Sequence, residues 1–408
     1  MAEPVAPRTP GSWIDSDRRI PTLVRPLLRF TQVESAGGIV LLVAAAAALA
    51  WANAPFGGSY ERFWSTPLHL GPVHLDESLR VVVNDGLMTV FFLVVGLEIR
   101  RELVSGDLRD ARTAALPAIA ALGGMIFPAL IYLAFTIPGG EGTRGWGIPM
   151  ATDIAFALGV ISLLGGRVPV SGRLFLLALA IADDIGAIIV IAVFYADSVA
   201  LGFVAAAAGG VALMYLGRRM GIRSWVFYLP MALAVWFLLF QSGVQATLAG
   251  VAIALVIPAT SGESASPETA LHPWSSLVIV PVFALANVGV RFVGVDLGAA
   301  VTHPIALGVA IGLLAGKVVG ITAFTWVAVR LRLGALPRHI SWRHVVGLAA
   351  IAGIGFTVSL FVTDLAFDTV GTADLAKTGI FLGSAAAGVT GFVALRTMKP
   401  LGSDESEP

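Results

Sequence analysis

The fold is decided by the stretch Leu176-Leu-Ala-Leu-Ala-Ile-Ala-Asp-Asp-Ile-Gly-Ala-Ile-Ile-Val190, a long apolar run that contains two adjacent carboxylates, Asp183 and Asp184. An apolar run of this kind is typical of a helix that crosses a lipid bilayer. At the centre of a bilayer each acid costs roughly 2.5 to 3.5 kcal/mol, and two neighbouring acids also repel each other. The pair therefore indicates a functional site inside the membrane.

The composition of the whole chain agrees with this interpretation. Hydrophobic residues make up 57% of the 408 residues and charged residues only 13%, whereas soluble domains carry about 25% charged residues. The chain contains no cysteine, which excludes disulfides, thiolate metal sites and iron–sulfur clusters. The formal net charge is zero, so no basic excess suggests a nucleic-acid partner. We predict an all-α polytopic membrane protein in the lipid bilayer.

The chain is predicted to have three parts. Residues 1–30 are rich in Pro and Arg and lack the apolar core and cleavage site of a signal peptide, so they are interpreted as a cytoplasmic extension. Within this extension, Leu23 to Phe30 is expected to form a short amphipathic segment at the membrane surface. Residues 31–397 form the membrane domain, and residues 398–408 form an acidic cytoplasmic tail.

Apolar runs of about 17 to 25 residues predict twelve transmembrane helices. They lie near residues 37–53, 81–99, 114–136, 146–166, 174–196, 200–217, 224–240, 243–258, 274–293, 304–328, 345–366 and 374–395. With a cytoplasmic N-terminus, 20 of the 26 Lys and Arg residues fall on the inner side, five fall outside, and Lys317 lies within a span. The positive-inside rule therefore predicts that both termini are cytoplasmic.

The loop between the first two predicted spans has a pattern of its own. The pattern of residues 66–76 is typical of two short strands around Gly71 and Pro72, and it predicts a small external hairpin. It is either an ordinary loop or a dimerisation element that offers strand edges to a second copy of the chain.

Four charged residues are predicted to meet near the middle of the membrane. Asp153, Asp183, Asp184 and Lys317 all lie about ten to thirteen residues from the inner ends of their spans at 1.5 Å per residue. Neighbouring residues on a helix point about 100° apart, so one member of the aspartate pair can face a water-filled cavity while the other pairs with the lysine. Three acids exceed one base, which favours ion transport over a purely structural ion-pair network.

Two predicted spans carry interruptions. Pro149 precedes the polar residues Thr152 and Asp153 in the fourth span, and residues 353–357 carry two glycines in the eleventh. Paired interruptions of this kind are typical of transporters built from inverted repeats, with two broken helices crossing at a midplane site. The alternative is that the glycines only permit close helix packing.

Five motifs are spread over the chain: Asn84-Asp-Gly-Leu-Met-Thr-Val-Phe-Phe-Leu-Val-Val-Gly-Leu-Glu-Ile-Arg-Arg-Glu-Leu103, Ala151-Thr-Asp-Ile-Ala-Phe-Ala-Leu-Gly159, Ala182-Asp-Asp-Ile-Gly-Ala187, Ser242-Gly-Val-Gln-Ala-Thr-Leu-Ala-Gly250 and Gly353-Ile-Gly-Phe-Thr357. They resemble those of the NhaA-type sodium/proton antiporters, and the resemblance runs from about residue 31 to residue 397. The resemblance implies a pH-regulated antiporter of the bacterial inner membrane that forms a symmetric homodimer through the hairpin at residues 66–76.

The resemblance also assigns roles at the predicted midplane site. It implies that Asp184 is the principal sodium ligand, that Asp183 is its neighbour paired with Lys317, and that Thr152 contributes to the ion site. Asp153 matches the acid that compensates facing helix ends.

Three further acids match positions outside that cluster. Asp85 and Glu98 match acids of the second span, and Glu98 matches the position where the family senses pH. Glu268 lies in a stretch that resembles a cytoplasmic pH-responsive loop. Two departures from the family pattern are Gln245, which stands where well-known members carry a histidine, and Asp364, an additional acid expected at the outer interface.

Competition between ions and protons predicts the mechanism. Carboxylate, hydroxyl and water oxygens suit a hard cation such as Na+ or Li+. Burial and mutual repulsion favour protonation of the empty site, so ion and protons exclude each other. We therefore predict that the chain is a transporter and not an enzyme, and that it needs no cofactor. A phosphate-binding loop is missing from the sequence, so we also predict that transport does not use ATP. The family resemblance further implies that the exchange is electrogenic.

Other functions remain open. The same fold could carry K+ or Ca2+, or the chain could be a passive cation channel, which would show flux without proton coupling. An intramembrane aspartyl protease is a further alternative, but the chain lacks a Gly-x-Gly-Asp element, and such an enzyme has no use for Lys317.

Overall fold

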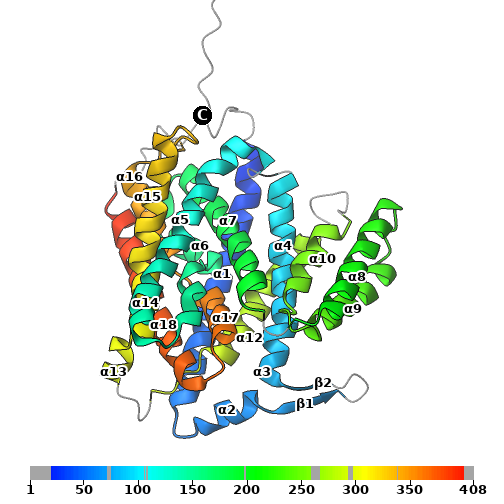
Figure 1. Ribbon diagram of the computed structural model, residues 1–408. Coiled ribbons are helices and arrows are strands. Elements are labelled where there is room, and N and C mark those ends of the chain that lie inside the picture. The colour runs from blue at the N-terminus through cyan, green and yellow to red at the C-terminus, as the bar shows by residue number, and fades with distance from the viewer. Residues whose placement is uncertain are drawn as a thin grey trace, which may run out of the picture.

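The computed structural model describes residues 20–70, 75–104, 106, 109–196, 199–258, 267–292, 297–337 and 339–398. Most helices run roughly side by side along one direction (Figure 1). One end of this bundle carries α2 (Gly58–Trp64) and a two-stranded sheet of β1 (Pro67–Leu70) and β2 (Leu75–Ser78). We call it the hairpin end. The other end, where α4 (Met88–Val104) ends and α16 (Trp342–Ala352) begins, is called the opposite end.

The remaining helices follow in chain order. The first part of the chain forms α1 (Ile20–Asn53), α3 (Leu79–Val81), α4 (Met88–Val104), α5 (Ala111–Thr136), α6 (Ile154–Ser162), α7 (Val170–Phe194), α8 (Leu201–Arg219), α9 (Trp225–Phe240) and α10 (Leu248–Val256). The second part forms α11 (Pro267–Trp274), α12 (Val280–Asn287), α13 (Leu297–Thr302), α14 (Pro304–Ile311), α15 (Lys317–Arg330), α16 (Trp342–Ala352), α17 (Phe356–Ala366) and α18 (Val370–Arg396). Of the short 3-10 and π-helical segments, four are named below where they matter.

The number of helices that can cross a membrane is nine among the described residues, or ten if the bent pair α16 and α17 is one span. Each of these corresponds to one predicted span. The other two predicted spans, at 224–240 and 243–258, correspond to α9 with 16 residues and α10 with 9 residues. Both are shorter than the about 20 residues that a helix typically needs to cross a bilayer. The structure therefore supports an all-α polytopic membrane protein, and the count of twelve stays a prediction.

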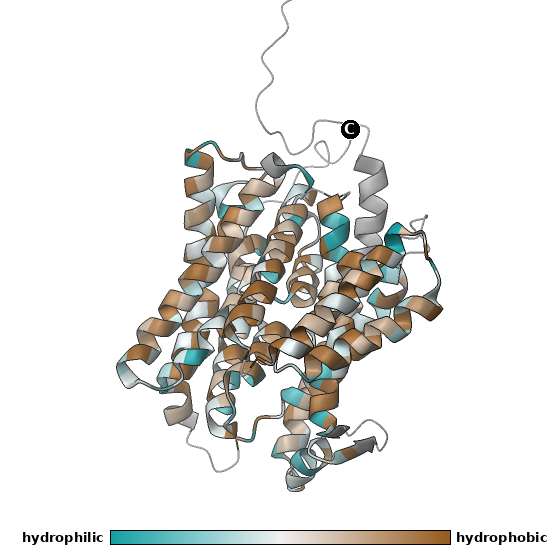
Figure 2. Cartoon of the chain, turned by 45° about the vertical axis from the view of Figure 1, so that its right-hand side comes forward, coloured by the Kyte–Doolittle hydropathy of each residue, from teal (hydrophilic) through white to brown (hydrophobic). Residues whose placement is uncertain are grey.

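The outer surface of the bundle is apolar, as expected for contact with lipid. Large hydrophobic side chains of α8 and α9 are exposed, and most of the outer helices are coloured as hydrophobic in Figure 2. Examples with more than half of their surface exposed are Leu201, Leu213, Leu216, Val226, Leu229 and Leu233. In water such a surface would be an aggregation site, whereas lipid solvates it.

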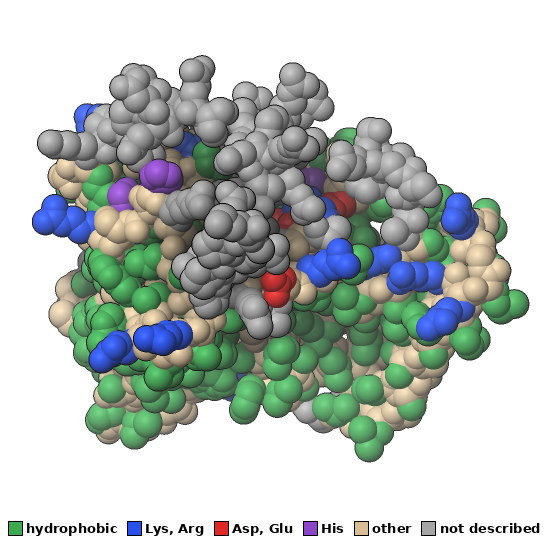
Figure 3. Space-filling model, turned by 90° about the horizontal axis from the view of Figure 1, so that it is seen from above, with side chains coloured by type: hydrophobic (Ala, Val, Ile, Leu, Met, Phe, Trp, Pro, Cys, Tyr) green, Lys and Arg blue, Asp and Glu red, His purple; other side chains and the backbone are tan. Residues whose placement is uncertain are grey.

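The two predicted terminal regions lie mostly outside the described residues, which exclude 1–19 and 399–408. Helix α1 begins at Ile20 and continues without a break to Asn53. The expected surface segment at residues 23–30 is thus helical but continuous with the first span rather than separate from it. Lys and Arg side chains are spread over the opposite end (Figure 3), which is the end predicted to be cytoplasmic.

The predicted hairpin is confirmed. β1 and β2 pair antiparallel, with Pro67 opposite Ser78 and Leu68 opposite Glu77, and the turn between them lies outside the described residues. Next to it, the two terminal guanidinium nitrogens of Arg80 donate to the Glu61 carboxylate at 2.8 and 2.9 Å. These bonds, aided by the positive charge of Arg80, lower the pKa of Glu61. The role of the hairpin in dimerisation stays a prediction.

Non-helical backbone occurs at both stretches where interruptions are predicted. A 3-10 segment at Thr143–Met150 (η5) is followed by extended residues 151–153 before α6 begins. Residues 353–355 separate α16 from α17, whose axes differ by 47°. The two stretches touch, because the backbone N–H of Asp153 donates to the carbonyl of Ile354 at 2.6 Å. A relation between them by inverted repeats stays a prediction.

Glycine is required at this contact. A Cβ on Gly353 would lie 2.3 Å from the carbonyl oxygen of Leu313, and a Cβ on Gly355 would lie 3.0 Å from that of Ala151. Only a residue without a side chain allows the backbones to approach this closely. The glycines therefore act by permitting the approach of the two broken stretches to each other and to the helix that carries Lys317.

Candidate functional site

An ion pair lies at the centre of the bundle. The ammonium of Lys317, at the start of α15, lies 2.5 Å from Oδ2 of Asp183 in the middle of α7, and both side chains are completely buried. The Thr152 hydroxyl oxygen accepts from Lys317 Nζ at 3.0 Å. That oxygen also lies 2.7 Å from Asp183 Oδ2 and 2.8 Å from the carbonyl oxygen of Ala352. A hydroxyl carries one proton, so Thr152 donates to one of these two acceptors at a time.

The second carboxylate oxygen of Asp183 is in a different situation. Oδ1 is buried and accepts no hydrogen bond from any described residue. Buried polar atoms normally have a partner, and exceptions often mark a functional role. Because Lys317 and Thr152 already lie against Oδ2, Oδ1 is the oxygen available to a proton or a cation.

Asp153 neutralises two helix N-termini at once. Its Oδ1 accepts from the backbone N–H of Phe156 at 3.1 Å and so caps α6. Its Oδ2 accepts from the backbone N–H of Thr357 at 3.1 Å and from the Thr357 hydroxyl at 2.5 Å, in the first turn of α17. Helix N-termini carry partial positive charge, which a carboxylate stabilises. The C-terminal end of α16, which carries partial negative charge, meets Thr152 and through it Lys317.

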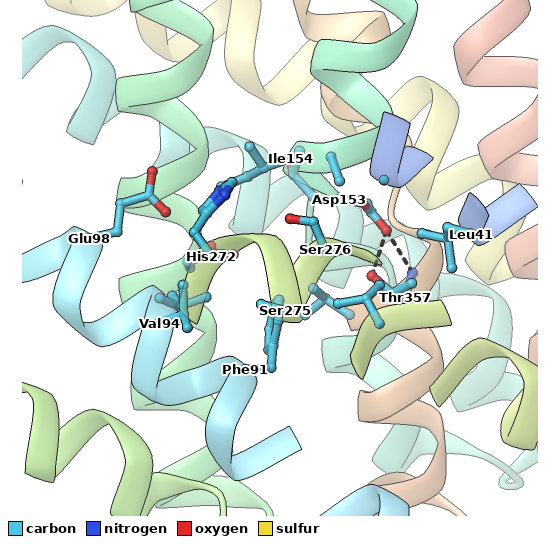
Figure 4. Close-up of a pocket in the computed structure, with 17 residues that line it drawn as sticks. Leu41, Phe91, Val94, Glu98, Asp153, Ile154, His272, Ser275, Ser276 and Thr357 are labelled. Atoms are coloured by element: carbon cyan, nitrogen blue, oxygen red, sulfur yellow. Dashed lines mark hydrogen bonds between the residues drawn. The ribbon is translucent and has the colours of Figure 1, made fainter. Parts of the chain in front are cut away.

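A cavity of about 60 Å³ opens beside this cluster. This volume is large enough to hold water molecules. Its wall includes Asp184, Asp153, Thr152, Glu98 and His272. Figure 4 shows Asp153 at one side and Glu98 and His272 toward the other. Asp183 and Lys317 lie behind Thr152 and do not line the cavity. The structure thus separates the two neighbouring acids, because Asp183 forms an ion pair with Lys317 and Asp184 lines the cavity.

Two of the three predicted pH-related acids lie near the cavity. Glu98 of α4 lines it directly and is 7% exposed. Glu268 lies on α11, where its carboxylate accepts from Arg101 of α4 at 2.5 Å and so joins the two helices that border the cavity. Asp85 lies 13 residues before Glu98, about 20 Å along the helix axis toward the hairpin end, and does not line the cavity.

Several cavity residues did not emerge from the sequence as site residues. Ser275, Ser276 and Thr357 add hydroxyl oxygens to the wall, and His272 adds an imidazole ring. A signal was present for two of them, because adjacent serines are unusual inside an apolar run. Ser275 also begins a π-helical turn (Ser275–Ile279), and another such turn (Gly312–Gly316) directly precedes Lys317. Turns of this type are frequent at functional sites.

The two departures from the family pattern lie away from the cavity wall. Gln245 is in the turn between α9 and α10. Asp364, near the end of α17, has a side chain only 19% exposed and forms an ion pair with Lys377. Asp364 is therefore part of a network rather than a solvated interfacial acid. Among the described residues, no group of three or more His, Asp or Glu side chains could hold a metal ion.

Fold and site together define a polytopic membrane protein with a charged cluster buried where two broken helical stretches meet, the architecture of a secondary transporter. A family model described as Na+/H+ antiporter 1 matches residues 28–395. The chain belongs to this family, whose members are transporters and not enzymes.

Individual relatives agree over nearly their full length. A Na(+)/H(+) antiporter NhaA of Shewanella frigidimarina is 45% identical over 391 residues, covering 94% of this chain and 99% of the relative. One from Koribacter versatilis is 42% identical, covering 95% and 94%. A Na(+)/H(+) antiporter NhaA 2 of Sorangium cellulosum is 44% identical, covering 92% and 90%.

Proposed function

We propose that this chain is an electrogenic Na+(Li+)/H+ antiporter that expels sodium from the cell and needs no cofactor and no ATP. The observation that carries the proposal is the division between two adjacent acids, Asp183 on the buried lysine and Asp184 on the cavity. This arrangement leaves one carboxylate open to the aqueous side while its neighbour is neutralised without an ion.

The ion site is proposed to consist of Asp184, Oδ1 of Asp183, the Thr152 hydroxyl and water. These are hard oxygen donors, which suit Na+ and Li+. In the absence of the cation, burial and the neighbouring acids favour a proton on Asp184. A cation can bind only when that proton leaves, so each species displaces the other. Access from one side at a time converts this competition into exchange.

The ion pair supports the proposed electrogenic stoichiometry. A cation held by both acids competes with Lys317 for Asp183, and an unpaired charge buried in the protein is costly. Lys317 then releases its proton as it loses its partner, in addition to the proton from Asp184. Two protons are thereby exchanged for one sodium ion, and net charge crosses the membrane.

The remaining roles extend the proposal to regulation and assembly. Glu98 and Glu268, with Asp85 further along the second span, are proposed to make the activity depend on pH, since Glu98 lines the cavity and Glu268 is bonded to Arg101 of the same helix. The chain is proposed to work in the bacterial inner membrane with both termini cytoplasmic, as a homodimer through the hairpin at residues 66–76. Residues 1–30 and 398–408 are proposed to flank a single membrane domain.

Transport in everted membrane vesicles tests the proposal. After respiration has acidified the vesicle interior, addition of NaCl or LiCl is expected to collapse the pH gradient between pH 6.5 and 9, because cation uptake must release protons. Vesicles without the protein serve as the control. A response to KCl would point to the same fold with another cation, sodium flux without a change in the gradient would indicate a channel, and no response to any cation would contradict the proposal.

A further inference from the structure

Helix α17 connects the cavity with the hairpin end in three steps. Val358 lines the cavity, Phe361 lies one turn further, and Asp364 one turn beyond that. Residues three apart on a helix share one face, so these three side chains follow one another along a path of about 9 Å. α12 has the same order, with Val280 at the cavity followed by Phe283 and Asn287.

An aromatic layer closes the path next to the cavity. The Phe361 ring of α17 lies 5.3 Å from that of Phe92 in α4 and 6.3 Å from that of Phe283 in α12, measured between ring centroids. The three side chains are 1%, 5% and 0% exposed. No hydrated ion can cross three rings packed in this way, so the cavity is sealed on the hairpin side.

A polar layer lies next to the rings on the side of the hairpin end. The Asn84 amide donates to Asp364 Oδ2 at 3.1 Å, and the Asn287 amide donates to the Asn84 oxygen at 2.7 Å. The ammonium of Lys377 on α18 lies 3.4 Å from the other carboxylate oxygen of Asp364. Asn84 belongs to a π-helical turn (Val82–Leu87) that leads into α4. The layer therefore ties α17 and α18 to the second span and to α12.

We propose that Phe92, Phe283 and Phe361 form the hairpin-side gate of the ion path and that Asp364, held by Asn84 and Lys377, latches it. Opening separates α17 from α4 and α12, which moves the rings apart and exposes the cavity to the hairpin side. A cation in transit then replaces the Lys377 ammonium on Asp364. This gate rests on the proposed transport function, because it gives the buried site its second access route.

Chemical accessibility tests the gate, and the absence of cysteine from the native chain makes every introduced thiol unique. Val358→Cys places a thiol on the cavity wall, and Phe56→Cys, at a position 66% exposed near the hairpin end, reports which vesicle face carries that end. A membrane-impermeant thiol reagent is applied from either face. Adding Phe361→Ala to Val358→Cys is expected to raise the labelling rate from the hairpin side at least about tenfold, since the rings no longer cover the cavity.

Two controls accompany this measurement. Phe324→Ala makes the same truncation in a ring pair between α15 and α5, and should leave labelling from the hairpin side unchanged. The rate of Val358→Cys labelling from the opposite side should be the same in all variants that fold. If Phe361→Ala does not fold, Phe283→Ala removes another ring of the gate and takes its place. Equal rates from the hairpin side with and without either truncation would overturn the gate.

A reversible cross-link tests the latch. Asn84→Cys with Asp364→Cys, joined by a short cleavable bifunctional thiol reagent, should abolish sodium/proton exchange, and cleavage should restore the rate of the untreated double variant. Full exchange while the bridge is intact would overturn the gate. Lack of exchange in the unmodified native chain would instead contradict the proposed function, so the two failures are distinguishable.

Discussion

Asp184→Asn is expected to reduce sodium/proton exchange by about 100-fold or more. The substitution keeps the size of the side chain but removes the charge that faces the cavity. Loss of a charged ligand costs about 3 kcal/mol, and each 1.4 kcal/mol corresponds to a factor of ten. The rate is measured as the initial sodium-dependent change of internal pH in proteoliposomes that contain equal amounts of purified protein.

The matched control is Asp368→Asn, the same change at an exposed position after α17. It should exchange at the native rate. The assignment of Asp184 to the ion site would be contradicted if Asp184→Asn elutes as a folded species and retains more than about a tenth of the native rate. A tenfold loss corresponds to only about 1.4 kcal/mol.

Lys317→Met is expected to destabilise the protein by about 3 to 5 kcal/mol, the typical cost of breaking a buried ion pair by removing one partner. Methionine preserves most of the length of the side chain but leaves Asp183 charged with only the Thr152 hydroxyl beside Oδ2. The loss is measured as the shift of the denaturation midpoint in detergent at neutral pH.

The double variant Asp183→Asn with Lys317→Met tests the cause. With both charges removed, most of the lost stability should return, because no unpaired charge remains to be buried. Equal destabilisation in the single and double variants would indicate that lysine packing, and not the ion pair, accounts for the effect.

Much of the site was predictable because the energetic cost of a charge inside an apolar helix is large. That cost identifies Asp153, Asp183, Asp184 and Lys317 without structural information, and helical geometry alone separates the directions of the two neighbouring acids. The family resemblance supplied the assignment of each acid. The structure added the hydrogen-bond partners, such as the contact of Asp153 with two helix N-termini.

The features that sequence did not reveal depend on three-dimensional contacts. Ser275, Ser276 and His272 become cavity residues only because α11 and the following π-helical turn lie against α4. Asp364 was expected at an exposed interface, and only packing of α17 against the second span and α18 shows its partners Asn84 and Lys377. The short lengths of α9 and α10, 16 and 9 residues, were also not predicted, because their sequences are as apolar as those of the longer helices.

If sodium and protons compete for the same buried carboxylates, sodium binding must release protons. Purified protein in a weakly buffered solution, at a pH where it exchanges, is mixed with NaCl while the pH is recorded, with choline chloride and Asp184→Asn as controls. Release of one to two protons per chain with sodium, and none in either control, is the predicted result. Sodium binding without any proton release would contradict the account.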